Sequence, residues 1–442
     1  MSERSESDRL QRESWLQRML RRPEIGSFVV MIIIILALAF ASNGKAFNAL
    51  GLKNNIAIIA QLGIIAVGAA LLMIAGEFDL SIGPMIAFAG MSIAIMMKWG
   101  LPFGLGEATP FLAFLITLCM TLAFGWLIGN IVVRSGLSSF IVTLAFWFFL
   151  RGLTEVCFRL INQNTNVSGL PDFKKESWFA EQMGGEVFGW FFDAWYWIGT
   201  KVSAGAEFTA EMTKSEKLDM INYLSFLNIN RKMEQWVTGF DARFLWFIVI
   251  AVVAYFILSR TQIGNWIYAT GDNKEAARAN GVPVNRVKIG LFMCTAFCAT
   301  MFAACQVFDT NTSDAAKGNL MELFAIAIAV VGGTLMTGGF GSVLGVVFGA
   351  ITVGLVANAV FFIPAIDGAW FRVFVGTVLL AAECCVPWIS LGALSPAHQT
   401  IPFRAQEPTP FQQPLALLPR RRAATQRLAR PLGRGRRTSR GA

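Results

Sequence analysis

Two carboxylates in a break between apolar segments are the residues of this chain best suited to chemistry. Glu77 and Asp79 lie within GEFDLSIG (76–83). An ionisable side chain is costly in lipid, so it usually faces a cavity, a partner or water, where it can hold a coupling ion or a proton. The alternative is that Asp79 caps the following helix by accepting its free N–H groups. The two roles are compatible.

The sequence lacks other catalytic and metal-binding constellations. Its single histidine, His398, lies in the C-terminal tail, and neither HExxH nor GxSxG occurs. No GxxxxGK[ST] loop is present, so we expect no ATP hydrolysis by that chemistry. Cys294 and Cys298 share a helix face without a nearby histidine or carboxylate. We therefore predict no metal site and interpret the seven cysteines as small buried hydrophobes.

Composition places the chain in a bilayer. Only 15% of its 442 residues are charged and 55% are hydrophobic, whereas soluble domains carry about 25% charged residues. We predict an all-α polytopic transmembrane helical bundle of about ten spans. The expected spans are Gly26–Ser42, Ile56–Ala75, Leu80–Met97, Pro110–Val133, Phe140–Phe158, Phe244–Leu258, Ile289–Val307, Leu323–Leu335, Ser342–Phe362 and Phe371–Ile389.

Basic residues predict the orientation. Arginines crowd the N-terminus and the C-terminal tail, so both termini are expected on the cytoplasmic side. We divide the chain into a basic cytoplasmic N-terminus (1–25), a membrane domain (26–391) and a tail (392–442). Counting spans places 159–243 outside and 260–288 inside. Basic ends that flank spans indicate membrane lipid rather than nucleic acid as the partner.

Two segments allow alternative interpretations. Residues 184–205 are long enough for a span, but aromatic side chains and Asp193 favour a helix lying flat at the membrane interface. Residues 392–442 are rich in proline and arginine and predict disorder. An out-of-frame translation would explain the tail as well.

Glycines mark breaks and packing faces. Those expected to have these roles are Gly76, Gly83, Gly332, Gly333, Gly338, Gly339, Gly341, Gly345 and Gly349. Gly341, Gly345 and Gly349 recur every four residues, a spacing that lets helices approach closely.

The charged stretch 260–288 separates two apolar runs. Glu275, Ala276, Ala277 and Arg278 predict a short helix, and Gly281 suits its C-terminal end. A rigid short helix outside the membrane can transmit the movement of a partner into the spans. An ordinary amphipathic loop explains the pattern equally well.

Four segments together resemble the permease subunits of binding-protein-dependent bacterial ABC importers, in the ribose/xylose and branched-chain amino acid group. They are GEFDLSIGPMIAFAG (76–90), SSFIVTLAFWFFLRGL (138–153), TQIGNWIYATGDNKEAARANGVPVNRVK (261–288) and FAIAIAVVGGTLMTGGFGSVLGVVFGA (324–350). The chain departs from the family pattern at Glu77, where a second glycine is usual, and at Asn265, where an arginine is usual. The ribose branch fits better than the amino-acid branch.

The resemblance implies a permease of the bacterial inner membrane that imports a sugar or polyol. It implies as partners an ABC ATPase subunit that binds ATP and Mg, a periplasmic solute-binding protein and a second permease copy, identical or different. The ATPase contact is then expected at Asn273, Glu275, Ala276, Ala277, Arg278 and Gly281. Asp79, Ser81, Phe140 and Thr143 are candidates for the translocation path. The alternatives are import of an amino acid or nucleoside by the same machinery, and a secondary ion-coupled transporter.

Overall fold

The computed structural model describes residues 23–101, 106–162, 165–187, 240–359, 362–363, 368–377 and 380. All of them belong to one compact unit, Met1–Val386. A second unit, Pro387–Ala442, lies outside the described residues. The predictions for the N-terminal segment up to residue 22, for most of the segment 159–243 predicted to lie outside (the exterior insert) and for the tail 392–442 therefore concern residues outside the described part.

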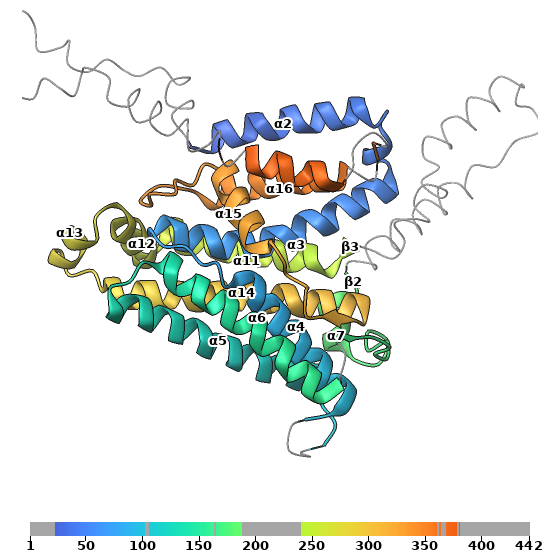
Figure 1. Ribbon diagram of the computed structural model, residues 1–442. Helices are drawn as coiled ribbons and strands as arrows, with labels where there is room; N and C mark the ends of the chain where they lie inside the picture. Colours follow the sequence, from blue (N-terminus) through green and yellow to red (C-terminus); the bar gives the residue numbers. More distant parts are fainter. Residues whose placement is uncertain are drawn as a thin grey trace, which may run out of the picture. The chain divides into compact units, whose positions relative to one another are not determined.

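The predicted all-α class is confirmed, since helices build the described chain and each strand has two residues (Figure 1). The helices and strands in chain order are α2 (Pro23–Ala41), η2 (Lys45–Phe47), α3 (Ala49–Ile74), α4 (Ile82–Trp99), α5 (Pro110–Ser135), α6 (Ser139–Asn162), β1 (Asn166–Val167), α7 (Trp178–Gly184), β2 (Glu186–Val187), β3 (Phe240–Asp241), α11 (Ala242–Arg260), α12 (Gln262–Asp272), α13 (Lys274–Ala279), α14 (Val284–Thr310), β4 (Ser313–Asp314), α15 (Met321–Val331) and α16 (Val343–Ala359).

Seven of the described helices are long and apolar enough to cross a membrane, and α15 and α16 are shorter apolar helices. These nine correspond to the first nine predicted spans. The eighth is short because α15 ends at Val331, where the expected break glycines follow: Gly332 is its C-cap and Gly333 has a positive φ of 83°. The tenth predicted span begins within the helical residues 368–377 and continues beyond the described part.

Local signals explain where the helices begin and end. The Thr109 side chain accepts the Leu112 N–H at 3.3 Å, and Pro110 is the first residue of α5. That helix ends at Gly136, which has a φ of 70°. Asn48 caps α3 in the same manner by accepting the Gly51 N–H at 2.7 Å.

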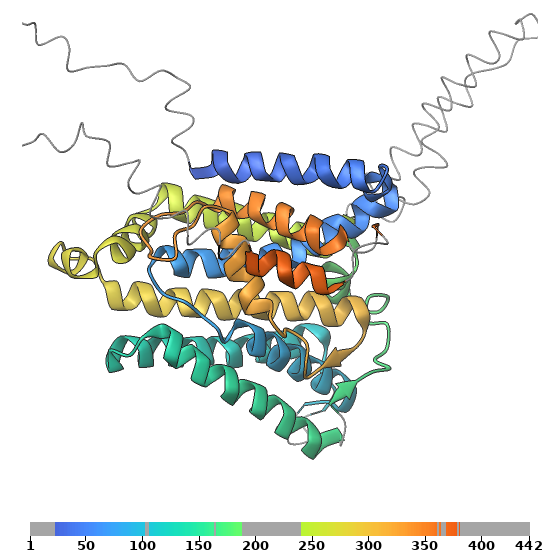
Figure 2. The ribbon, with the colours of Figure 1, turned by 45° about the horizontal axis from the view of Figure 1, so that its top comes forward.

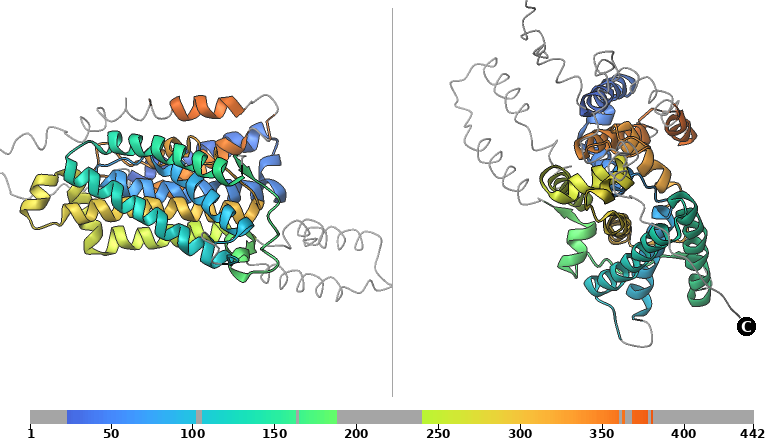
Figure 3. Two further views of the ribbon diagram at one scale, coloured as in Figure 1. Left: turned by 60° about the horizontal axis from the view of Figure 1, so that its bottom comes forward. Right: turned by 90° about the vertical axis from the view of Figure 1, so that its left-hand side faces the viewer.

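The apolar helices divide into central and peripheral ones. In the most apolar stretches of α14, α3 and α4, 78%, 72% and 72% of the residues are buried. The corresponding shares are 17% for α2 and 22% for α6. Helix α14 packs on α3, α4 and α5, and Figure 3 shows it surrounded by the other helices. The peripheral helices present apolar side chains outward, as a lipid-facing helix does.

Small residues bring α5 and α14 together. A Cβ on Gly125 would lie 2.7 Å from the Phe292 carbonyl oxygen, and one on Gly129 would lie 2.8 Å from Ile289 Cα. One turn before Gly125, the buried hydroxyls of Thr121 and Thr300 meet at 2.6 Å. Helix pairs in membranes associate through such small residues and interhelical hydrogen bonds.

The first turn of α4 meets the loop that precedes α15 inside the bundle. A Cβ on Gly83 would overlap both the Gly318 carbonyl oxygen and the Glu322 carboxylate. Gly318 itself has a φ of 78°, and a side chain there would overlap the Gly83 carbonyl. Irregular backbone at this depth is tolerated because protein rather than lipid surrounds it.

The charged loop (260–288) and the residues that flank the predicted exterior insert lie at opposite ends of the bundle. Figures 1 and 2 place α12 and α13 at one end and α7, β2 and β3 at the other. At the second end β2 pairs with β3, and β1 pairs with β4. Which side of a membrane each end faces stays a prediction from the basic residues.

We expect Gly125→Leu to destabilise the bundle. The added side chain would overlap the backbone of α14, and overpacking typically costs about 1–3 kcal/mol. Thermal unfolding in detergent measures the loss. Gly290→Leu is the matched control, since nothing lies within 4 Å of a Cβ at Gly290. Equal midpoints for the two variants would contradict this account of the α5–α14 contact.

Candidate functional site

Helix α13 is a short helix with both ends capped. The Asn273 side chain accepts the Glu275 and Ala276 N–H groups at 3.1 and 3.0 Å. At the other end the Gly281 N–H donates to the Arg278 carbonyl and the Val282 N–H to the Ala277 carbonyl, both at 3.0 Å. This is the Schellman arrangement, and Gly281 supplies its positive φ of 80°. Caps of this kind hold six residues in a rigid helix.

The members of α13 expected to meet a partner divide by exposure. Glu275, Ala276 and Arg278 are exposed, whereas Ala277 is 4% exposed and packs into its own chain. Arg278 pairs with Glu275 at 3.0 Å and donates to the Asn285 side chain at 3.2 Å. The helix therefore presents a small-residue surface at Ala276, and Ala277 anchors it.

The end of α12 touches the two glycine-rich breaks directly. A Cβ on Gly271 would overlap the carbonyl oxygen of Ile74, the last residue of α3. The same carbonyl accepts the Gly339 N–H at 2.8 Å. A Cβ on Gly338 would lie 2.8 Å from Gly76 Cα. Three backbone segments meet here because no side chain stands between them.

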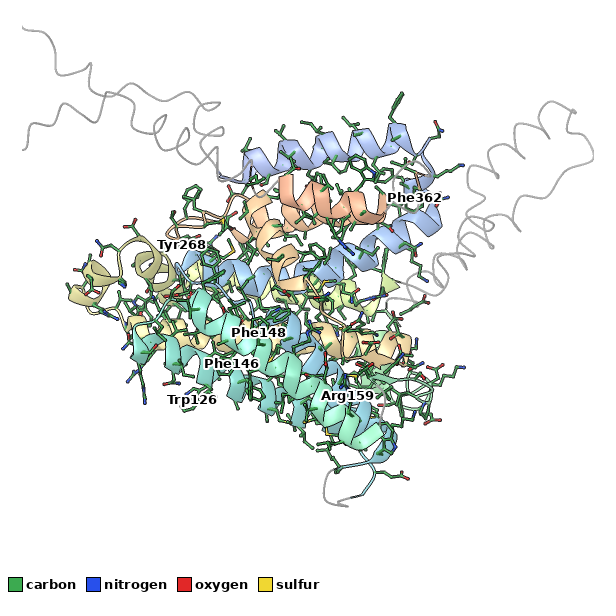
Figure 4. All side chains as sticks on the ribbon, in the orientation of Figure 1. Trp126, Phe146, Phe148, Arg159, Tyr268 and Phe362 are labelled. Carbon is green, nitrogen blue, oxygen red and sulfur yellow. The ribbon has the colours of Figure 1, made fainter. Side chains whose placement is uncertain are left out.

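A side chain adds a second contact between α12 and the later break. The Tyr268 hydroxyl donates to the Gly341 carbonyl at 2.7 Å. Tyr268 is labelled in Figure 4, at the junction of α12 with the loop between α15 and α16. Gly341 has a φ of 155°, and a Cβ there would lie 2.8 Å from the Ile74 side chain. Movement of α12 therefore acts on both breaks.

An ion pair joins the first break to the end of the charged loop. Lys288, in the first turns of α14, pairs with Glu77, and each side chain is 12% exposed. A largely buried charge needs its partner, because removing one member leaves an uncompensated charge. The glutamate that departs from the resembled family pattern thus has a defined contact.

Asp79 is tied to α4 and α14 at once. Its Oδ1 accepts the Ser81 N–H at 2.8 Å and the Ser81 hydroxyl at 2.5 Å, and its Oδ2 accepts the Thr295 hydroxyl at 2.5 Å. Ser81 is the residue that precedes α4, so the carboxylate holds the start of that helix rather than the N–H groups of its first turn. Asp79 is 6% exposed and lies between helices.

Three of the four path candidates, Asp79, Ser81 and Thr143, are buried, and the fourth, Phe140, is exposed. Thr143 is fully buried and donates to the Ser139 carbonyl at 2.8 Å, whereas Phe140 is 51% exposed. Phe140 belongs to the outer face of α6, with Phe148 of Figure 4 also exposed. Ser139 connects α6 to the first break, because its hydroxyl accepts the Phe78 N–H at 3.1 Å.

Sequence reasoning missed several members of this junction. They are Tyr268, Gly271, Lys288, Ser139 and Thr295. Gly271 and Lys288 left weak signals, a glycine two residues before Asn273 and a lysine at the start of an apolar run. Among the described residues no group of three or more His, Cys, Asp or Glu side chains gathers as metal ligands would.

The fold and this junction define a multi-pass α-helical membrane protein in which two short helices at one end are joined to breaks between its spanning helices. The chain belongs to the family described as the branched-chain amino acid transport system / permease component, whose pattern matches residues 51–382. The matched region contains both breaks and the whole charged loop.

Individual relatives cover most of the chain. The inner membrane ABC transporter permease protein YjfF of Escherichia coli (strain K12) is 29% identical over 72% of this chain and 78% of its own length. The xylose transport system permease protein XylH of the same strain is 29% identical over 80% of this chain and 88% of its own. The ribose import permease protein RbsC of Haemophilus influenzae is 26% identical over 75% and 84%. No solved structure is significantly similar.

We expect Glu77→Gln and Lys288→Met each to destabilise the protein, by about 3–5 kcal/mol if the charge left behind stays buried. The double variant removes both charges and should lose much less than the sum of the single losses. Thermal unfolding in detergent of the unaltered protein, the two single variants and the double variant gives the double-mutant cycle.

The control for this cycle is Glu275→Gln, which breaks the exposed pair with Arg278 and should cost at most about 1 kcal/mol. Additive losses for Glu77→Gln and Lys288→Met would show that the two side chains do not interact.

Proposed function

We propose that this chain is the membrane-spanning permease subunit of an ABC importer in a bacterial inner membrane, and that the machine carries a sugar or polyol. The observation that carries the proposal is the direct contact of α12 with both helix breaks through Gly271, within the region that matches the permease family. The names of relatives that import xylose and ribose support a sugar as the solute.

The partners follow from this function. An ABC ATPase subunit, which binds ATP and Mg, docks at α12 and α13. A periplasmic solute-binding protein docks at the opposite end, where β2 and β3 form the root of the exterior insert. A second permease copy completes the translocation path. Both termini and residues 260–288 then face the cytoplasm, as the basic residues favour.

Coupling acts through rigid contacts. The ATPase moves α13, whose caps keep it from deforming, and α13 moves α12. Gly271, Tyr268 and Lys288 transmit the displacement to the breaks after α3 and after α15. A coupling between distant sites requires such a physically continuous connection between elements that have two arrangements.

The path candidates fit a closed state of the subunit. Asp79, Ser81 and Thr143 are buried between α4, α6 and α14, so the solute reaches them only after these helices separate. Phe140 lies outside, on a face of α6 available to lipid or to the second copy.

Reconstitution tests the function. Proteoliposomes that contain this chain, its ATPase and the solute-binding protein should accumulate a labelled pentose, and D-xylose and D-ribose are the first probes. Uptake should require ATP on the side of the membrane to which the ATPase is bound. Uptake without the ATPase, driven by a proton or sodium gradient, would instead establish a secondary transporter.

We expect Ala276→Glu to weaken ATPase binding to the permease, since it places bulk and a charge on the exposed small-residue surface of α13. Binding of the purified ATPase to detergent-solubilised permease should fall by about tenfold or more, the equivalent of about 1.4 kcal/mol. Ala276→Ser, which keeps the small size, is the control. Wild-type affinity for Ala276→Glu would show that the ATPase docks elsewhere.

We expect Gly271→Ala to separate ATP hydrolysis from transport. The added methyl group would push α12 away from Ile74, while α13 remains available to the ATPase. The measurement is the number of sugar molecules carried per ATP hydrolysed, which should drop by about tenfold if the displaced contact is worth about 1.4 kcal/mol. Gly290→Ala, at a position with open space, should keep the ratio. An unchanged ratio in Gly271→Ala would exclude this contact from the coupling route.

A further inference from the structure

A cavity of about 360 Å³ lies between α3, α14, α16 and the loop that leads into α15. Its size falls within the range of about 300–1,000 Å³ typical of small-molecule sites. Gln61, Gln306, Lys317 and Asn319 contribute polar groups to its wall, and Phe324 contributes aromatic surface. None of the four polar residues belongs to the path candidates named from the sequence.

The amide groups of this cavity are free to bind a ligand. Within the described chain, the Gln306 and Asn319 side chains make no hydrogen bond with protein. Gln61 uses only its carbonyl oxygen, which accepts from Arg243 at 3.2 Å. A side-chain amide both donates and accepts, as a hydroxyl group does. The Gln306 and Asn319 amides are therefore available to hydrogen-bond a polar occupant of the cavity.

The loop that carries Lys317 and Asn319 is held rigidly. The Arg151 guanidinium donates to the carbonyls of Ala315 and Lys317 at 2.6 and 3.3 Å. The Trp147 ring lies against that guanidinium, 5.6 Å from its centre. On the same loop Gly318 packs against the Gly83 backbone. A site built on a fixed backbone binds with little loss of conformational entropy.

The charges around the cavity balance. Lys317 donates to the Thr310 hydroxyl at 3.3 Å and to the Thr312 carbonyl at 3.1 Å. Burial lowers the pKa of Lys317, and the carboxylates of Asp314 and Asp309 act in the opposite direction. Asp309 pairs with Arg243 at 3.0 Å and with Lys174 at 3.9 Å, so carboxylates and cations lie together beside Lys317. Mixed charges of this kind favour a neutral solute over an anionic one.

We infer that this cavity is a binding site for a neutral polyhydroxylated solute, with the free amides of Gln306 and Asn319 binding its hydroxyl groups and the Phe324 ring covering an apolar face. The inference rests on the proposed function and assigns the solute a site within a single subunit. Asn319 is exposed and Gln306 is half-buried, so a solute can reach the amides without unfolding of the bundle.

Transport by the full complex of permease, ATPase and binding protein tests the site, with D-xylose and D-ribose as probes. We expect Gln306→Leu and Asn319→Leu each to lower the uptake rate by about threefold to tenfold, the value of one lost hydrogen bond. Gln306→Asn should recover part of the rate. Asn130→Leu is the control, since Asn130 bonds to its own helix at the Trp126 carbonyl and lies outside the cavity wall.

A second measurement separates binding from a structural effect. The cysteine introduced by Asn319→Cys should react with a membrane-impermeant maleimide, and the transported sugar with its binding protein should slow that reaction at least about threefold. Mass spectrometry of the labelled peptide distinguishes position 319 from the native cysteines. A sugar that the complex does not carry should leave the rate unchanged.

The outcomes distinguish failure of the proposed function from failure of the cavity as a binding site. If the unaltered complex accumulates neither sugar in an ATP-dependent manner, the proposed function fails for these solutes and the site fails with it. If the unaltered complex transports but both leucine variants keep its rate, or if the sugar gives no protection at position 319, only the site is overturned. The cavity is then a space filled by lipid or detergent.

Discussion

The close approach of three backbone segments at Gly271 is the constraint on which the rest of this protein depends. The end of α12 lies against the carbonyl of Ile74, and that carbonyl also accepts the Gly339 N–H. A single methyl group at position 271 has no room. Because glycines stand at this contact, the backbone of the charged loop touches the backbone of both breaks. The short helices therefore cannot move independently of the spans.

Breaks inside an apolar bundle expose backbone and charged groups that lipid cannot satisfy. The structure meets this requirement with specific partners from other helices. Asp79 holds the start of α4 and accepts the Thr295 hydroxyl, Ser139 binds the Phe78 N–H, and Arg151 binds two carbonyls of the loop before α15. These contacts make the irregular segments as well defined as the helices around them.

Rigidity at one end and an accessible cavity within the bundle are complementary properties of a transporter subunit. In the proposed function, the capped α13 and the glycine contacts transmit the movement of the ATPase without deforming. The loop before α15 borders the cavity on one side, and the Arg151 contact and the packing on α4 fix it on the other. A displacement of α4 relative to α15 therefore changes the shape of the cavity wall, and in the proposed function this change connects movement at the breaks to the solute.

The sequence alone determined the membrane class, nine of the ten span positions within the described chain, the break at Gly332 and Gly333, and the short helix α13 with Gly281 at its C-terminal end. These features depend on local apolar content, glycines and capping residues, and local patterns are readable along a chain. Only the tertiary structure paired Glu77 with Lys288, brought Gly271 onto Ile74, separated Phe140 from Thr143 and turned Ala277 inward. Each of these depends on which helices become neighbours and how each rotates about its axis. Lipid-facing and core-facing positions are equally apolar here, so no sequence pattern encodes that choice.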